Sequence, residues 1–315
     1  MRIQIALSLV ALAAATPLRS SRRQLNTSDP VKCPIIFDGR IPQPFNLSLF
    51  DSALTSPFNP NYVKGENLTW SQILLLPSSN SSSNRSSIPT SRFDLPAVHQ
   101  PLEVTIDDRS LFRAGERLQP GFRRAGLLLK NDANDPFADT ADNGSATFHW
   151  SIQADPSRPL NLSHEYMNVW HEKADYSGNQ FTFVGGVVLA VDGGDGVDTK
   201  EEREVWKVQN AKNEFVFRTK MLFDAWQNFA VKLDYVNNTI QVFYSAGNEA
   251  LKAVTEPLPN ANAGGGQLQL GIAKKPTETE TVVWDGYHEH IPNNGEGQIY
   301  GSVFVEDSTS GCVTL

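Results

Sequence analysis

The feature that most constrains the fold is a series of short segments rich in Val, Phe, Thr and Trp, separated by clusters of Gly, Pro, Asn and Asp. Short apolar segments at this spacing, with turn residues between them, are typical of antiparallel sheets that pack face to face. We therefore predict an all-β chain, a single-domain antiparallel β-sandwich of jelly-roll type over residues 33–315. The predicted strands are 102–106, 122–129, 147–153, 165–171, 180–191, 204–209, 214–219, 228–235, 239–244, 267–272 and 298–305.

Helical periodicity is scarce, and only residues 70–76 and 201–205 are expected to form a turn or two of helix. One hairpin is expected over 233–244, with Asn237 and Asn238 either as a two-residue turn or as part of a longer loop. No repeat of 20 to 50 residues is visible, which argues against propellers and solenoids.

The amino-acid composition limits the kinds of partner that this chain is expected to bind. The chain has 27 Lys and Arg against 35 Asp and Glu, a net charge of -8, and no basic cluster that could follow a phosphate backbone. Nucleic acid is therefore not expected as a partner. Beyond the N-terminus, no window is apolar for about 18 residues, so we expect no membrane partner either. We expect a monomer.

The N-terminus has the pattern of a secretory signal. Residues 1–15 combine a charged start, a short apolar stretch and a small-residue end, and they are too short to span a bilayer. A buried N-terminal helix is the alternative. The N-terminal segment 16–32 contains Arg22-Arg23, which is either a dibasic processing site or a solvated charge pair.

Asn-X-Ser/Thr sequons support the secretory route, because such sequons are the acceptors of N-linked glycans. They predict a secreted, extracellular glycoprotein. A Ser/Asn-rich surface loop is expected at 78–91, where few residues can be buried. The predicted glycosylation sites are Asn26, Asn46, Asn67, Asn80, Asn84, Asn143, Asn161 and Asn237.

Only two cysteines are present, Cys33 and Cys312. An oxidising compartment favours a disulfide between them, which would join the two ends of the domain. The last four residues also match a prenylation box, but prenylation takes place in the cytosol, which a secreted chain does not enter.

Several classes of chemistry have no motif here. The chain lacks the serine-hydrolase, zinc-protease, phosphate-loop and dinucleotide motifs. The acidic stretch 192–198 does not have EF-hand spacing, and we interpret it as a Gly-Asp turn. The sequence therefore predicts neither a metal nor a cofactor.

Residues 164–172 form the densest group of polar and aromatic side chains. On a regular strand, Asn168, Trp170 and Glu172 would share one face, and Glu165 and His171 the other. Rings can stack on a sugar while amides and acids bind its hydroxyls, so this segment indicates a sugar site. A structural strand at a solvated sheet edge is the alternative.

A second polar segment is 122–129, where Arg124 lies inside an apolar strand. A buried arginine needs a carboxylate, and we expect Glu165 opposite it. Trp226 and Asn228 are either sugar-contacting residues or parts of the core and a turn.

These segments together resemble the catalytic domain of fungal glycoside hydrolase family 131. The resemblance covers nearly the whole mature chain in order. It is carried by CPIIFDGR at 33–40, NPNYVKGENLTW at 59–70, GFRRA at 121–125, RPLNLSHEY at 158–166, WQNFAV at 226–231, IYG at 299–301, EDS at 306–308 and GCV at 311–313.

The resemblance implies a β-jelly roll that acts on β-glucans with 1,3, 1,6 or 1,4 linkages, using two carboxylates. It places one glutamate at Glu165. It implies a second glutamate directly after Arg-Arg-Ala, where this chain has Gly126, and a histidine where it has Gln269. Glycine cannot transfer a proton, so a substitute acid would have to come from elsewhere. Glu103, Glu116 and Glu172 are the candidates for that acid.

The sequence thus predicts a secreted hydrolase of β-glucan with catalytic Glu165 and Arg124. The predicted sugar-binding residues are Asn168, Trp170, Trp226 and Gln269. One alternative is a β-glucan-binding protein that has lost its acid. A structural cell-wall protein with no sugar site is another.

Overall fold

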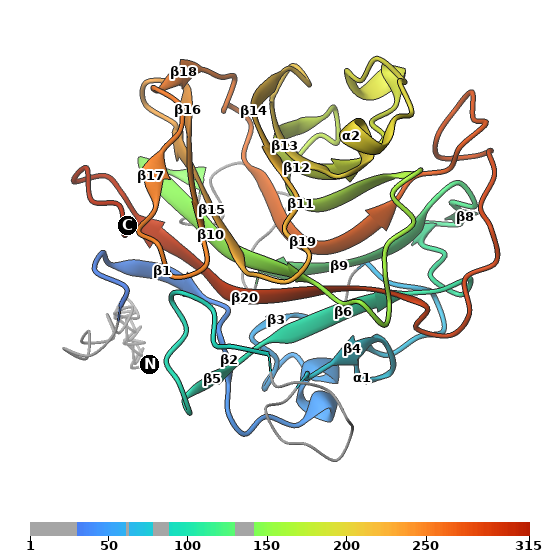
Figure 1. Ribbon diagram of the computed structural model, residues 1–315, viewed down its shortest axis with the longest axis horizontal. Coiled ribbons are helices and arrows are strands. Elements are labelled where there is room, and N and C mark those ends of the chain that lie inside the picture. The colour runs from blue at the N-terminus through green and yellow to red at the C-terminus, as the bar shows by residue number, and fades with distance from the viewer. Residues whose placement is uncertain (1–29, 61–62, 78–87, 130–141) are drawn as a thin grey trace, which may run out of the picture.

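The computed structural model describes residues 30–60, 63–77, 88–129 and 142–315. Two large antiparallel sheets account for most of the regular structure (Figure 1). The first has nine strands in the order β17-β16-β15-β10-β20-β6-β4, with β1 also paired to β20 and β18 to β16. Its strands are β1 (Ile35–Asp38), β4 (Leu74–Leu75), β6 (Leu102–Ile106), β10 (Ser145–Ala154), β15 (Gln227–Asp234), β16 (Thr239–Ala246), β17 (Lys252–Ala253), β18 (Leu258–Pro259) and β20 (Glu296–Asp307).

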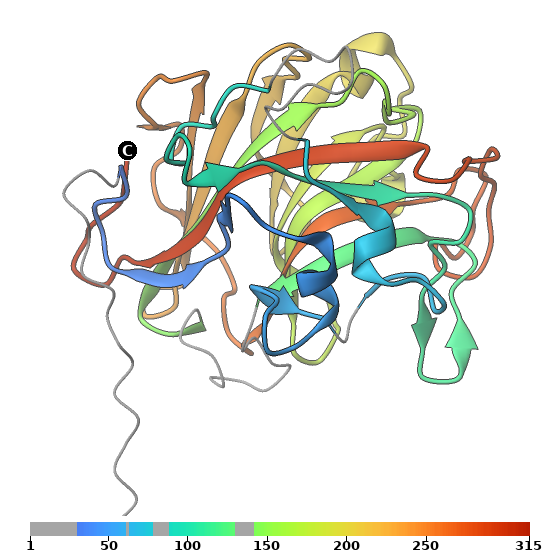
Figure 2. The same ribbon diagram turned by 90° about the horizontal axis from the view of Figure 1, so that it is seen from below.

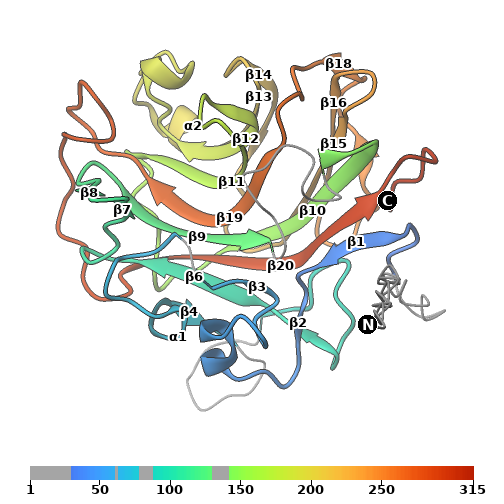
Figure 3. The ribbon, with the colours of Figure 1, turned by 180° about the vertical axis from the view of Figure 1, so that it is seen from behind.

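The second sheet has seven strands in the order β14-β13-β12-β11-β19-β9-β3, and Figure 3 shows β9, β19 and β11 side by side. Its strands are β3 (Phe58–Asn59), β9 (Arg123–Leu129), β11 (Glu165–Lys173), β12 (Asn179–Gly186), β13 (Val205–Asn210), β14 (Phe215–Lys220) and β19 (Gly266–Lys274). Every pairing in both sheets is antiparallel, as predicted for a jelly-roll sandwich.

Short elements complete the fold. The small pairs are β2 (Ile41–Pro42) with β5 (His99–Gln100), and β7 (Arg113–Ala114) with β8 (Arg117–Leu118). Figure 2 shows the β7–β8 hairpin projecting from the body of the molecule. The helical turns are η1 (Leu47–Asp51), α1 (Trp70–Ile73), η3 (Ala190–Asp192) and α2 (Lys200–Arg203). No helix in the described ranges is long and apolar enough to cross a bilayer.

The core fills the space between the facing sides of the two sheets. Phe148 and Trp150 of β10 pack against Phe181 and Phe183 of β12, and the rings of Trp150 and Phe183 meet edge to face at 5.2 Å. Because strand side chains alternate, the other side of the seven-stranded sheet is left for polar residues.

All the predicted strands are present, with small differences at their ends. The largest difference is in the segment 180–191, where β12 ends at Gly186. That glycine has φ +76, and a Cβ there would lie 2.0 Å from the carbonyl oxygen of His164, so the chain turns away from the sheet. The predicted hairpin is β15–β16, and because Asp234 pairs with Thr239 it has the longer of the two expected loops.

The predicted disulfide is confirmed. Cys33 and Cys312 are bonded, at a sequence separation of 279. Nearby, the Oγ1 of Thr314 accepts from the backbone N–H of Lys32 at 3.0 Å, so hydrogen bonds hold the same two ends of the domain.

Several sequence predictions lie outside the described residues: the signal segment 1–15, Arg22-Arg23, most of the loop at 78–91, and the sequons at Asn26, Asn80 and Asn84. Among the described sequons, Asn46, Asn67, Asn143 and Asn237 are exposed. Asn161 differs, because its Nδ2 donates to the Oε1 of Glu289 at 2.9 Å.

Candidate functional site

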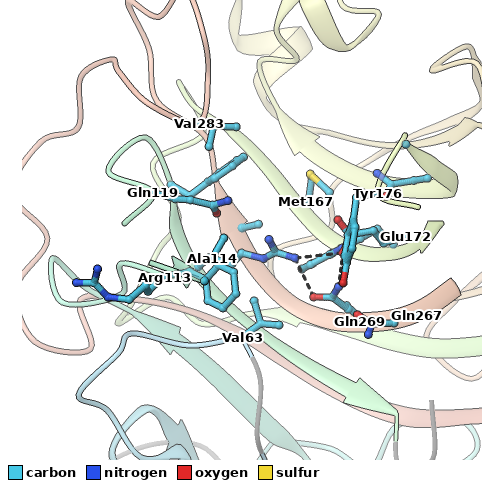
Figure 4. A pocket seen from close by; sticks show the side chains of 18 residues that line it. Val63, Arg113, Ala114, Gln119, Met167, Glu172, Tyr176, Gln267, Gln269 and Val283 are labelled. Atoms are coloured by element: carbon cyan, nitrogen blue, oxygen red, sulfur yellow. Dashed lines mark hydrogen bonds and ion pairs between the residues drawn. The ribbon is translucent and has the colours of Figure 1, made fainter. Parts of the chain in front are cut away.

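A pocket of about 870 Å³ lies on the outer side of the seven-stranded sheet, over β9, β11 and β19. Its floor includes Arg124 of β9, Trp170 and Glu172 of β11, and Gln269 of β19. Figure 4 shows the walls: Arg113, Ala114 and Gln119 lie on one side, and Tyr176 lies beside Glu172 on the other. The volume lies within the usual range for ligand pockets, about 300 to 1,000 Å³.

Strand alternation and one β-bulge decide which residues of β11 reach this pocket. The pairing of β11 with both neighbours shifts between Met167 and Val169. Tyr166 and Val169 both point into the core, whereas Met167 and Trp170 both line the pocket. The regular alternation predicted for residues 164–172 is therefore wrong, because the extra residue in the bulge reverses the faces after it.

Three side chains on the floor form a connected polar group. The Nη2 of Arg124 donates to the Oε1 of Gln269 at 3.0 Å, and the Nε2 of Gln269 donates to the Oε2 of Glu172 at 2.8 Å. The Nη2 of Arg124 also lies 3.6 Å from the Oε2 of Glu172. Burial lowers the pKa of Arg124, and the charge of Glu172 opposes that shift. Arg124 thus pairs with Glu172 rather than with Glu165.

Aromatic rings hold the guanidinium of Arg124 in place. Its central carbon lies 5.5 Å from the ring centre of Phe112 and 5.3 Å from that of Trp170. Cation–π contacts of this kind stabilise a buried arginine, and they leave its N–H groups free to donate hydrogen bonds in the plane of the guanidinium group. The pocket therefore presents a fixed cation beside a carboxylate and an amide.

Gly126, where the resemblance implies a glutamate, lies directly beside this group. A Cβ on Gly126 would lie 2.9 Å from the Oε1 of Gln269 and 3.1 Å from the Trp170 ring. A side chain at position 126 would therefore require the Gln269 amide and the Trp170 ring to move aside.

Among the described residues that line the pocket, Glu172 is the only carboxylate. The other candidate acids lie elsewhere. Glu103 is fully buried and receives two hydrogen bonds from Arg158, at 2.7 and 2.9 Å. Glu116 is exposed in the β7–β8 turn and does not line the pocket.

The structure places Glu165 at the far end of β11, outside the pocket. It is 1% exposed, its Oε1 lies 2.5 Å from the Nζ of Lys275, and its Oε2 accepts from the backbone N–H of Leu189 at 2.9 Å. Lys275 also pairs with Asp192, at 2.8 Å. Burial raises the pKa of Glu165, and the Lys275 ammonium opposes that shift. The loop that follows β12 thus covers this carboxylate.

The predicted sugar-binding residues divide into two groups. Trp170 and Gln269 line the pocket. Asn168 is fully buried within the bulge, where its Nδ2 donates to the hydroxyl of Tyr300 at 3.2 Å. Trp226 is 4% exposed and donates to the carbonyl oxygen of Pro89 at 2.7 Å, and neither Asn168 nor Trp226 lines the pocket.

An ionic cluster holds the segment that supplies Val283 to the wall. Glu289 pairs with Lys274, its Oε2 lies 2.8 Å from the Nε2 of His164, and its Oε1 accepts from Asn161. Burial alone would raise the pKa of Glu289, but the hydrogen bonds from Lys274 and Asn161 hold it at about 2. The segment after β19 is therefore fixed to the sheet by ion pairs and hydrogen bonds of Glu289.

Strained backbone occurs around the pocket. Val63, which lines it, has φ +82, and its carbonyl accepts from the N–H of Gly126 at 2.8 Å. Tyr176 has φ +58, and Val282, next to Val283 of the wall, has φ +60. Positive φ is rare for branched and bulky residues, and such strain is found preferentially at functional sites.

The wall residues were missed by the sequence reasoning. Phe112, Gln119, Tyr176 and Val283 come from turns and loops, where no periodic pattern marks the orientation of a side chain. In the described part of the chain, no three His, Cys, Asp or Glu side chains come together as a possible metal site.

Comparisons with known proteins agree with this architecture. A search of curated proteins found no match. The catalytic domain of a family 131 β-glucanase from Podospora anserina matches with a TM-score of 0.61 and 15% identity, over 87% of this chain and 96% of that one. The family 131 catalytic domain from Coprinopsis cinerea matches with a TM-score of 0.58 and 16% identity, over 87% and 94%. At such identities these structures show a shared fold.

The sequence itself carries the assignment to a family. Residues 35–311, which include both large sheets and every described residue of the pocket, match the family model of the glycoside hydrolase 131 catalytic N-terminal domain. The chain therefore belongs to glycoside hydrolase family 131.

Proposed function

We propose that this protein is secreted, that its pocket binds β-glucan, and that its hydrolytic activity is weak because the described residues of the pocket include a single carboxylate. Three features support glucan binding: the family, the shared fold with a β-glucanase from Podospora anserina, and a floor that combines an aromatic ring with amide, guanidinium and carboxylate groups. Sugar sites need such a combination, since each ring has apolar faces and an edge of hydroxyls.

The proposal of weak hydrolysis depends on one observation, which is that Glu172 has no second carboxylate beside it among the described residues of the pocket. Hydrolysis of a glycosidic bond normally uses two carboxyl groups about 5 to 9.5 Å apart. Here the described lining has Glu172 alone, and the backbone of Gly126 lies where the resemblance implies the partner. A positioned general acid or base is typically worth about 10²- to 10⁴-fold in rate. We expect a loss of this order relative to a site with both carboxylates.

The test measures binding and reducing-end release on the same proteins. Calorimetric titration with β-1,3/1,6-glucan and β-1,4-glucan oligosaccharides should show binding by the wild-type protein. Gly126→Glu should release reducing ends faster than the wild-type protein. Gly126→Ala adds a Cβ in the same crowded position without a carboxylate, and it should show no gain. A double variant, Gly126→Glu with Gln269→His, also replaces the Gln269 amide, which would otherwise crowd the new glutamate side chain.

Each outcome decides between specific alternatives. Rapid wild-type hydrolysis that Gly126→Glu does not increase and Glu172→Gln abolishes would overturn weak activity, and it would show that Glu172 works with an acid outside the described lining. Failure of the wild-type protein to bind either glucan would refute the glucan-binding proposal. No gain in either Gly126→Glu protein, with glucan still bound, would show that lost activity does not depend on this one carboxylate.

Secretion is tested separately. The protein expressed with its own N-terminus in a eukaryotic host should appear in the medium, beginning after residue 15 or, if Arg22-Arg23 is cleaved, after residue 23. Protein retained in the cells with Met1 intact would contradict the proposed route.

A further inference from the structure

An open apolar groove lies at the surface around the helical turn η1, apart from the pocket described above. We call it the η1 groove, and its volume is about 620 Å³. Its apolar side chains are half-buried or exposed, and its one polar side chain is an asparagine. Connected apolar patches at a protein surface mark places where another group makes contact. The lining residues are Pro44, Phe45, Asn46, Leu47, Leu49 and Leu76.

The asparagine in the η1 groove belongs to a glycosylation sequon. Asn46, Leu47 and Ser48 form the pattern Asn-X-Ser, and both Asn46 and Ser48 are exposed. An N-linked glycan is attached to the Nδ2 of its asparagine. Because Asn46 itself lines the groove, the first sugar of a glycan on this residue would be placed at the groove by a covalent bond.

The side chain of Asn46 already has a fixed orientation. Its Oδ1 accepts from the backbone N–H of Ser48 at 3.0 Å and from the hydroxyl of Ser48 at 3.1 Å, and Asn46 is the N-cap of η1. Its Nδ2 has no hydrogen-bond partner in the described part of the chain. At two other sequons Nδ2 is already bonded, from Asn161 to Glu289 and from Asn237 to Asp234, both at 2.9 Å.

The ring of Phe45 gives the groove a rigid apolar face next to the attachment point. Phe45 directly precedes Asn46 in sequence, and the centre of its ring lies 4.9 Å from that of Phe50, which is fully buried. A sugar ring has an apolar C–H side that packs well on such a surface. Since the amide and the aromatic ring are both held in place, little conformational entropy is lost in the contact.

We propose that Asn46 carries an N-linked glycan whose innermost N-acetylglucosamine packs on the η1 groove and covers its apolar side chains. This inference rests on the proposed secretion, because N-linked glycans are added to chains that enter the secretory route. The co-reactant is an oligosaccharide bonded through C1 to a lipid diphosphate. The bond from Nδ2 to C1 forms, the bond from C1 to the diphosphate oxygen breaks, and Nδ2 loses one proton. The lipid diphosphate leaves, and one amide N–H remains.

The test uses protein secreted by a eukaryotic host. Glycopeptide mapping should find Asn46 modified. Ser48→Ala removes the sequon and keeps the asparagine cap, whereas Asn46→Asp removes the acceptor nitrogen and keeps a cap oxygen. Both variants should unfold at a temperature about 2 to 4 °C below that of the wild-type protein, because the sugar contact is lost. Ser48→Ala should also bind more of an apolar dye such as ANS. Ser48→Thr keeps the sequon and should match the wild-type protein.

Trimming identifies which sugar makes the contact. An endoglycosidase that leaves one N-acetylglucosamine on each asparagine should leave the unfolding temperature and the dye binding of the wild-type protein unchanged. A decrease equal to that of Ser48→Ala would overturn the role of the innermost sugar. Asn143→Gln is the matched control, since it removes another exposed sequon asparagine that does not line the η1 groove. It should leave both measurements unchanged.

The remaining outcomes are distinct from one another. Secreted protein with unmodified Asn46 would overturn the inference, and so would wild-type stability of both Ser48→Ala and Asn46→Asp. A decrease in Asn143→Gln as large as in Ser48→Ala would show a general effect of glycans rather than a contact at the η1 groove. Protein that stays in the cells would refute the proposed secretion, on which this inference depends.

Discussion

Two glutamates of β11 show how position changes the role of the same side chain. Glu165 is 1% exposed and paired with Lys275, whereas the side chain of Glu172 is 22% exposed and meets Arg124 and Gln269 in the pocket. A buried charge whose partner is removed is strongly destabilising, while a partly solvated one can be neutralised at little cost. Substitution of Glu165 should therefore affect mainly the stability of the fold, and substitution of Glu172 mainly the binding of glucan.

Glu165→Gln should lower the free energy of unfolding by about 3 to 5 kcal/mol, because it leaves the buried ammonium of Lys275 with one carboxylate fewer. Glu172→Gln should destabilise the protein less than Glu165→Gln, because Glu172 is partly exposed and Gln269 stays bonded to Arg124, but it should weaken glucan binding. Urea denaturation and calorimetry on both variants check this. A stable Glu165→Gln protein that has lost glucan binding would instead support the sequence-based prediction that Glu165 acts at the site.

At the scale of elements, a short turn is attached to β20 through one buried carboxyl group. The Oδ2 of Asp94 accepts from the hydroxyl of Ser91 at 2.6 Å and from the backbone N–H of Ser302 at 3.1 Å. Burial raises the pKa of Asp94 to about 6, although these two hydrogen bonds oppose the shift. The turn therefore holds a carboxyl group that is protonated more readily in the folded protein than in the unfolded chain.

The sign of the pH dependence follows from this shift. The folded state keeps the proton of Asp94 up to a pH of about 6, whereas the unfolded chain releases it near 4. The stability from this group is thus fully present below pH 4 and is lost between pH 4 and 6. Asp94→Asn should remove that change, so the stability difference between wild type and variant should vary by up to about 3 kcal/mol.

Urea denaturation at several pH values from 4 to 7 measures the difference. Asp224→Asn, the same substitution at an exposed position, is the control. Parallel profiles for the wild-type protein and Asp94→Asn would show that Asp94 has an ordinary pKa in the folded state.

The bulge in β11 is a second feature that belongs to the scale of elements. It depends on how β11 pairs with β12 and β19, since both registers shift between Met167 and Val169. A period of two is a local property of the chain, and the sequence pattern of residues 164–172 contains no sign of the interruption. The strand was therefore predictable, but the side chains on its pocket face were not.

For the whole molecule, the disulfide closes nearly the entire described domain. In the chain-entropy model, a bond across 279 residues stabilises mainly by restricting the unfolded chain, by about 5 kcal/mol. Replacing both Cys33 and Cys312 by serine should lower the free energy of unfolding by that order, as measured by denaturant titration. A loss below about 1 kcal/mol would mean that the hydrogen bonds at Thr314 and the β1–β20 pairing hold the ends without it.

The sequence by itself determined the all-β class, the longer strands of both sheets, the Cys33–Cys312 bond and the family. These follow from local alternation, turn residues, the presence of only two cysteines, and motifs that run along nearly the whole chain. Arg124 and Trp170, which the polar residues of their strands suggested, and Gln269, which the resemblance suggested, line one pocket.

Only the tertiary structure decided which carboxylate lies in the pocket. Glu165 is covered because the loop after β12 brings Leu189 and Asp192 over it, and Glu172 lines the pocket because the bulge turns it outward. The pocket walls likewise depend on turns far apart in sequence, at Phe112 and Tyr176. Such choices arise from contacts between distant segments, and a single sequence records the residues of those segments but not which of them meet.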